Sequence, residues 1–268
     1  MTISKSARYA LMSLMGVGLV FIYLPLSVVV INSFNSSKTF SWPPTSFTTL
    51  WWSKAIENSG VRSALKWSIL AGISATSIAL VLGTTLAFAV SRYSFFGREI
   101  ISLLVVLPIS LPGVVTGIAL NNALTKELGM STGLLTVIIG HATFCIVVVY
   151  NNAIARLRRM GTSLQEASMD LGANGITTFR LITLPNLASA LFAGGLLAFG
   201  LSFDEIVVTT FTAGPGIQTL PIWIYNNLFR PNQAPIVNVV AAVLVVFSIF
   251  PIYLSQRLSQ DSTSGGRF

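Results

Sequence analysis

The chain has 268 residues, of which 53% are hydrophobic and only 9% are charged. Soluble domains hold about 45–50% apolar residues even when glycine is counted, so this composition predicts a membrane protein and argues against a soluble enzyme. The formal net charge of +8 is dispersed along the whole chain and forms no single basic stripe, which argues against a nucleic-acid partner.

Charge-free stretches mark the candidate membrane spans, because a charged side chain at the bilayer centre costs at least about 2.5 kcal/mol. About 20 apolar residues cross the hydrocarbon layer. We therefore expect an all-α membrane protein with six transmembrane helices, at residues 10–32, 65–90, 100–121, 133–154, 187–211 and 235–256. The further charge-free stretch 206–229 contains Gly214-Pro215-Gly216 and Pro221, which predicts a short helix buried against protein instead of a span.

The basic residues indicate the orientation of these spans. With both termini inside, ten Lys and Arg residues lie in inner segments and six in outer ones, which agrees with the positive-inside rule. We therefore expect cytoplasmic termini and periplasmic segments at 33–64 and 212–234. The apolar run after Lys5 and Arg8 is longer than the core of a signal peptide, so we expect it to remain as the first span.

Residues that enzymes use are scarce. None of the five lysines follows a glycine, which excludes a P-loop, and a single histidine and a single cysteine leave no His/Cys zinc site. His141 lies in the fourth span, where an ionisable residue is a functional candidate by default. The alternative that we favour is a neutral imidazole bonded to a neighbouring helix.

Two glycines and two prolines lie in the third span. Gly113 and Gly117 form a GxxxG pattern, which predicts close helix packing. Pro108 and Pro112 precede it, and a kink with free carbonyl groups facing a cavity is a second interpretation of this segment.

A polar segment at residues 160–187 interrupts the apolar sequence. Ser163 and Glu166 fit a capping box at the start of a short helix, and Gly172 stands where a left-handed residue would end it. Asn174 is a candidate cap for a second short helix, which we expect to end before Pro185. The segment therefore predicts a helix-turn-helix on the cytoplasmic face.

The first of these short helices carries one apolar face. Leu164, Ala167 and Leu171 follow one another at helical spacing. Since two such short helices have little apolar surface of their own to bury, we expect the segment to be a docking element for another protein.

Several residues of this segment carry a family resemblance. Glu166-Ala167-Ser168, then Gly172, then Ile182-Thr183-Leu184-Pro185 resembles the EAA motif of permease subunits of binding-protein-dependent ABC importers, with Ser168 in place of the second alanine. The resemblance implies one permease domain over residues 1–268, with the type I ABC importer fold and a cytoplasmic coupling helix. The residues implied to contact the ATPase are Glu166, Ala167, Asp170, Leu171, Gly172, Ala173, Leu184 and Pro185.

The same resemblance implies partners and a location. The expected assembly holds a homologous second permease, an ATPase dimer that binds ATP and Mg, and a periplasmic substrate-binding protein. The chain itself would then be no enzyme, with no cofactor, metal or catalytic residue of its own. It would lie in the bacterial cytoplasmic (inner) membrane.

Three further stretches extend the resemblance along the chain. They are SFN after the first span, LPISLPGVVTGIAL in the third, and SFDEIVVTTFTAGPGIQTLPIWIY near the fifth. The last is similar to the second permease type of the spermidine/putrescine importer group, which implies a small cationic solute moved by alternating access. The alternatives are another amine, an amino-acid-like or a phosphonate solute, a secondary transporter, which would need inverted repeats, or a membrane enzyme.

Two acidic residues are candidates for the solute path. Asp204 and Glu205 are the only adjacent acids of the chain, and long charge-free sequence flanks them. Attraction of an ammonium group is one interpretation; an acid at a helix end that is exposed to water or paired with Arg230 is the other. Trp51, Trp52, Trp223 and Tyr225 are expected first as interfacial anchors, and Trp52, Trp223 and Tyr225 are kept as candidate cation contacts on the path.

Overall fold

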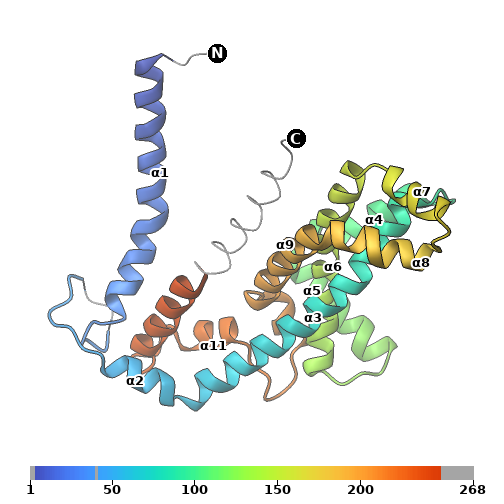
Figure 1. The fold of residues 1–268 in the computed structure, drawn as a ribbon. Helices are drawn as coiled ribbons and strands as arrows, with labels where there is room; N and C mark the ends of the chain where they lie inside the picture. The colour runs from blue at the N-terminus through green and yellow to red at the C-terminus, as the bar shows by residue number, and fades with distance from the viewer. Residues whose placement is uncertain (1–3, 40–41, 249–268) are drawn as a thin grey trace. The chain divides into compact units, whose positions relative to one another are not determined.

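The computed structural model describes residues 4–39 and 42–248, and all regular structure among them is helical apart from one bridge between Asn35 and Phe47. A last helix of the described chain covers Ala234–Ser248. The other helices, labelled in Figure 1, are α1 (Lys5–Asn32), α2 (Leu50–Glu57), α3 (Ser59–Arg92), α4 (Arg98–Ser110), α5 (Gly113–Asn122), the π-helical turn η1 (Ala123–Glu127), α6 (Leu134–Arg159), α7 (Ser163–Asp170), α8 (Gly175–Thr178), the π-helical turn η2 (Phe179–Thr183), α9 (Leu184–Phe203), α10 (Val207–Thr212) and α11 (Leu220–Asn227).

The chain forms two compact units. Within the described residues, one contains the N-terminal part up to Arg62 together with residues 224–248, and the other contains Ser63–Trp223. In the first unit the large apolar side chains of α1 between Tyr9 and Leu24 are exposed, as expected for a helix that faces lipid or another chain.

Aromatic residues fix the segment after α1 in the first unit. The indole Nε1 of Trp51 donates to the carbonyl oxygen of Asn35 at 3.0 Å. The rings of Phe34 and Trp52 stack with their centroids 5.1 Å apart. Since Trp51 is buried and lies at the start of α2, these contacts hold α2 against the segment that follows α1.

The core of the second unit lies between α3, α6 and α9, and Figure 1 shows α9 running beside α6. Small residues allow these helices to approach closely. A Cβ atom at Gly72 would lie 2.9 Å from the Phe199 ring, and one at Gly83 would lie 3.0 Å from the carbonyl oxygen of Ile146. Such small-residue contacts are typical of helix packing in membranes, where van der Waals contact drives association.

Four helices of the described chain are long and apolar enough to cross a membrane: α1, α3, α6 and a continuous helix over Gly175–Phe203. The pair α4 and α5 makes a fifth candidate, with a bend of 107°. Ala234–Ser248 is shorter, and residues 249–256 of the expected sixth span lie outside the described residues. The all-helical class is confirmed, and the number of six spans stays a prediction.

The span expected at residues 100–121 is broken. The helix ends at Ser110, Leu111 is extended with a ψ of 145°, and α5 begins after Pro112. Proline disfavours a helical conformation for the residue before it and has no N–H group to donate, which explains a break at this position.

The expected fifth span at 187–211 is also interrupted. α9 ends at Phe203, and Asp204, Glu205 and Ile206 separate it from α10, which begins at Val207. We call these three residues the α9–α10 break. The short helix expected in 206–229 is confirmed as two pieces, α10 and α11, and both contain buried residues such as Thr209 and Leu220.

Candidate functional site

The turn between α7 and α8 is built around a left-handed glycine. Gly172 has a φ of +88°, as predicted. Its N–H group donates to the Met169 carbonyl oxygen at 2.9 Å, and the N–H group of Ala173 donates to Ser168 at 3.1 Å. This pair of bonds is a Schellman motif, which satisfies carbonyl groups at the end of a helix and fixes the direction of the chain that follows.

Side-chain hydrogen bonds hold α7 against α8 and against the π-helical turn η2 that follows it. The buried amide of Gln165 donates to the hydroxyl of Thr183 at 2.8 Å. The hydroxyl groups of Ser168 and Thr178 lie 3.1 Å apart. Asn174 caps α8 as expected, since its Oδ1 accepts from the Thr177 N–H group at 2.8 Å. The segment is therefore internally braced and presents a fixed outer surface.

The capping box predicted for Ser163 and Glu166 does not form. Thr162 is the N-cap residue, and no side chain caps this end of α7. The N–H groups of Gln165 and Glu166 both donate to the Thr162 carbonyl oxygen at 2.9 Å. Since Ser163 is already the first helical residue, it does not occupy the cap position from which a hydroxyl reaches the amide of the third helical residue.

Pro185 does not end the second short helix, contrary to prediction. One continuous helix runs over Gly175–Phe203, with the π-helical turn η2 directly before α9. Pro185 occupies the first turn of α9. Inside a helix a proline lacks the N–H group that would bond to the preceding turn, and the wider π-helical turn directly before Pro185 shows where the regular bonding pattern changes to accommodate it. The polar segment and the fifth apolar helix are therefore mechanically joined.

The outer side of α7 and α8 is apolar and exposed. Leu171 is 89% exposed and Ile176 81%, and Leu164 and Met169 are exposed as well. We call these four side chains the α7–α8 surface. Of the residues implied to contact an ATPase, Glu166, Ala167, Asp170, Leu171 and Gly172 are exposed around this surface, Ala173 is half-buried, and Leu184 and Pro185 are exposed at the start of α9.

The α9–α10 break places the two adjacent acids in different environments. The carboxylate of Glu205 accepts from the N–H group of Val208 at 2.8 Å and so caps α10. The side chain of Asp204 is exposed and has no hydrogen bond or ion pair within residues 4–39 and 42–248. The two acids therefore lie between α9 and α10, outside both helices.

His141 is fully buried beside this break. Its Nδ1 lies 2.7 Å from the Ser202 hydroxyl of α9, and its Nε2 lies 2.8 Å from the Thr209 hydroxyl of α10. The predicted bond to a neighbouring helix therefore exists, and it reaches two helices at once. The buried thiol of Cys145 contacts the carbonyl oxygen of Ala198, one turn earlier in α9, at 3.3 Å.

Gly113 and Gly117 pack α5 against α10. A Cβ atom at Gly117 would lie 2.5 Å from the Phe211 ring, and one at Gly113 would lie 3.3 Å from Val207. The predicted close packing of this GxxxG pattern is confirmed. The second interpretation of this segment expected a kink, and the bend between α4 and α5 agrees with that part of it. Leu111 and Pro112 separate the two helices.

The aromatic candidates differ in exposure. Trp223 is buried in α11, Trp52 is partly buried against Phe34, and Tyr225 is 64% exposed. Trp52 belongs to the first unit and Trp223 to the second. Only Tyr225 therefore offers an open ring face of its own in this structure.

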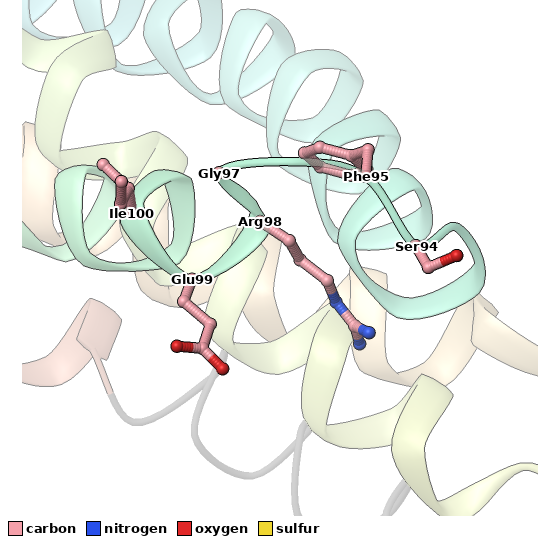
Figure 2. Close-up of a pocket in the computed structure, with 6 residues that line it drawn as sticks. All are labelled: Ser94, Phe95, Gly97, Arg98, Glu99 and Ile100. Atoms are coloured by element: carbon pink, nitrogen blue, oxygen red, sulfur yellow. The ribbon is translucent and has the colours of Figure 1, made fainter.

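A shallow hollow of about 370 Å³ lies at the turn between α3 and α4, and Figure 2 shows Arg98 and Glu99 extending to the same side of this turn. Its lining residues are Ser94, Phe95, Gly97, Arg98, Glu99 and Ile100. None of the predicted coupling or solute-path residues lines it, so we do not assign the hollow to either function.

Comparisons with known proteins decide the family. Residues 79–263 match the family described as binding-protein-dependent transport system inner membrane component. The chain belongs to this family. It is a permease subunit of an ABC importer in the inner membrane.

Named relatives of this permease cover nearly its whole length. It is 33% identical over 246 residues to the spermidine/putrescine transport system permease protein PotC of Escherichia coli K12, covering 91% of this chain and 92% of that one. It is 34% identical over 235 residues to the putrescine transport system permease protein PotI of the same organism, covering 85% and 83%. A bacterial ABC transporter that imports the acidic polysaccharide alginate shares the fold, with a TM-score of 0.73 at 15% identity over 97% of this chain and 99% of that one.

Sequence reasoning missed several residues that hold the α7–α8 turn and the α9–α10 break of the permease in place. Gln165 and Thr183 brace the two short helices, and Ser202 and Thr209 bind His141. For Ser202 and Thr209, the available signal was a hydroxyl in an otherwise apolar stretch, which needs a hydrogen-bond partner in a membrane. Gln165 and Thr183 lie in the polar segment, where the pattern carries no such signal. The partner itself lies 18 to 68 positions away in the chain, so its identity depends on the fold.

Proposed function

We propose that this permease forms half of the path for a small cationic amine, such as putrescine or spermidine, and moves it by alternating access. The support from similarity is that PotC and PotI, which share about a third of its residues, are named as permeases of spermidine/putrescine and putrescine transport systems. The support from the chain itself is Asp204, whose exposed carboxylate has no partner in the described residues. This carboxylate carries the proposal for a cationic solute.

An exposed acid next to apolar helices favours a cation over an anion. The attraction between a carboxylate and an ammonium group grows as water is excluded around them. The last carbonyl groups of α9 also lie at this point, and the C-terminal end of a helix carries partial negative charge. We therefore propose that the α9–α10 break lies on the solute path.

The proposed assembly contains a homologous second permease, two ATPase subunits and a periplasmic substrate-binding protein. We propose that the α7–α8 surface docks on an ATPase subunit and acts as the coupling helix. Leu171 and Ile176 are apolar and almost wholly exposed, which is unfavourable in water and typical of a docking surface. The continuous helix from Gly175 to Phe203 would carry a movement of this surface into the membrane.

The proposed topology has six spans with both termini in the cytoplasm. Its basis is the ten-to-six distribution of basic residues and an even number of spans. Single cysteines at Ser36 and Ser163, on a Cys145→Ala background, are expected to react with an impermeant thiol reagent from opposite sides of the membrane. Reaction of both cysteines from the same side would contradict this topology.

Uptake by the reconstituted complex tests the solute class. We expect proteoliposomes that hold the permease pair, the ATPase and the loaded binding protein to take up labelled putrescine or spermidine when ATP is inside. The matched control is the same complex without its ATPase, which we expect to take up neither. Uptake of a zwitterion with net negative charge, such as 2-aminoethylphosphonate, with no uptake of either polyamine, would contradict the proposal.

A further inference from the structure

His141 joins the two helices on either side of the α9–α10 break. Ser202, its partner on α9, lies two residues before Asp204, and Thr209, its partner on α10, lies four residues after Glu205. All three side chains are buried, with at most 2% of their surface exposed. The imidazole ring of His141, which comes from α6, therefore links α9 and α10 across the break.

The protons of this cluster can be assigned from its hydrogen bonds. The hydroxyl of Thr209 donates its single proton to the carbonyl oxygen of Glu205 at 2.8 Å, so it accepts from Nε2 of His141. A neutral imidazole with its proton on Nε2 then accepts at Nδ1 from the Ser202 hydroxyl. The result is one directed chain of hydrogen bonds from Ser202 through His141 and Thr209 to the backbone of Glu205.

α10 is fixed independently of α9. The amide of Asn121 on α5 donates to the carbonyl oxygen of Phe211. The hydroxyl of Thr136 on α6 donates to the carbonyl oxygen of Thr212 at 2.7 Å. Gly117 and Phe211 are in close contact, as described above. These contacts anchor α10 to α5 and α6. The hydrogen bonds of His141 therefore hold the end of α9 in one position relative to an anchored helix.

We infer that His141 is a positioning residue, which holds the end of α9 so that the Asp204 carboxylate points into the solute path. This inference rests on the proposed role of Asp204. His141 is buried and acts through the break, with no contact to the solute. Its loss frees the last turn of α9, and Asp204 no longer has one fixed direction.

The number of amine molecules transported per ATP hydrolysed tests this role. A complex that assembles poorly loses uptake and hydrolysis together, whereas a displaced Asp204 lowers the ratio. We expect His141→Leu to lower the ratio for putrescine about fivefold, the size expected for two lost interhelical hydrogen bonds in a membrane. His141→Gln keeps an acceptor and a donor on one planar group, so we expect it to restore the ratio to within about twofold of the wild type.

Two controls separate positioning from general damage. Thr143→Val also removes a hydrogen bond from α6, but that hydroxyl bonds only to the Gly140 carbonyl oxygen of its own helix, so we expect an unchanged ratio. In an Asp204→Asn background, we expect His141→Leu to cause no further fall, because both changes act on one carboxylate. An unchanged ratio in His141→Leu, or an equal fall in the Asp204→Asn background, would overturn the inference.

Thiol labelling tests the geometry without any solute. A cysteine at Asp204, on a Cys145→Ala background, is expected to react with an impermeant reagent at a rate that changes at least about threefold with His141→Leu and returns with His141→Gln. Equal rates in all three proteins would overturn the role of His141. An Asp204→Asn complex with a wild-type transport ratio would instead overturn the proposed solute path, while the labelling rates still decide whether His141 holds the break.

Discussion

The α7–α8 surface and the α9–α10 break differ in where their polar and apolar side chains find contacts. At the break, the buried polar side chains of His141, Ser202 and Thr209 bond to one another, and the chain satisfies them by itself. At the α7–α8 surface, the polar groups are braced inside and the apolar side chains of Leu171 and Ile176 point outward. The buried network beside the break is complete within this chain, whereas we propose that the α7–α8 surface is completed by another protein.

This difference predicts how the two regions respond to change. A substitution on the α7–α8 surface removes contact area with a partner and leaves the internal bonds of the permease in place. A substitution at the break alters a network inside one subunit, where a lost partner leaves another buried group unsatisfied.

Leu171→Asp is expected to have the largest effect on assembly. An anchor side chain at the centre of an interface contributes about 2 kcal/mol or more, which is roughly a thirtyfold change in Kd for the ATPase. Titration of the detergent-solubilised permease pair with the ATPase measures this change. Leu128→Asp is the matched control, because Leu128 is an equally apolar, 68% exposed side chain outside the surface. Equal losses in the two variants would contradict the assignment of the surface.

Gly172→Val is expected to disturb the same surface through the backbone. A residue with a Cβ atom pays about 1–2 kcal/mol in the left-handed conformation, and a β-branched residue pays more. We therefore expect amine-stimulated ATP hydrolysis to fall roughly tenfold while the permease remains folded. Gly172→Asn is the control, since asparagine tolerates a φ of +88° better than valine does, and it is expected to retain most of the activity. Full activity in Gly172→Val would show that the turn does not set the docking geometry.

Asp204→Asn preserves the size of the side chain and removes its charge. We expect putrescine uptake to fall roughly fivefold, in the range of a charge attraction near water, while ATPase binding stays unchanged. The measurement is the initial rate of uptake at saturating loaded binding protein. An unchanged rate would show that Asp204 is only an exposed acid at the end of α9 and has no role in uptake.

Glu205→Gln is expected to have the smallest effect, although it removes the neighbouring charge. The amide oxygen of glutamine still accepts from the Val208 N–H group, so the cap on α10 persists and uptake stays within about twofold. Glu205→Ala removes the cap and is expected to lower the stability of the permease by about 1 kcal/mol, which a thermal unfolding assay in detergent detects. A larger loss of uptake for Glu205→Gln than for Asp204→Asn would reverse the roles of the two acids.

The sequence predicts those features that depend on neighbours along the chain. The left-handed Gly172, the cap at Asn174 and the close packing at Gly117 all follow from local patterns and all are present. The helix end at Pro185 was mispredicted because the π-helical turn before it is invisible in the pattern of apolar residues. Proline disrupts the bonds of a regular helix, but the π-helical turn accommodates it and the helix continues from Gly175 to Phe203.

Features that depend on contacts between distant parts of the chain could not be predicted from the sequence alone. The acids at 204 and 205 could not be distinguished by pattern, because both lie in the same charge-free surroundings. The structure distinguishes them by the end of α9 at Phe203 and by the bond from Glu205 to α10. The partners of His141 lie 61 and 68 positions further along the chain, and only the packing of α6 against α9 and α10 brings them together.

The most direct test of the contrast measures putrescine uptake and ATP hydrolysis in the same proteoliposomes, for Leu171→Asp and Asp204→Asn in parallel. We expect Leu171→Asp to lower both rates together, so that the amine transported per ATP stays at the wild-type value. We expect Asp204→Asn to lower uptake alone, so that the same ratio falls. A fall in the ratio for Leu171→Asp, together with a wild-type ratio for Asp204→Asn, would contradict the division of coupling and solute path between these two regions.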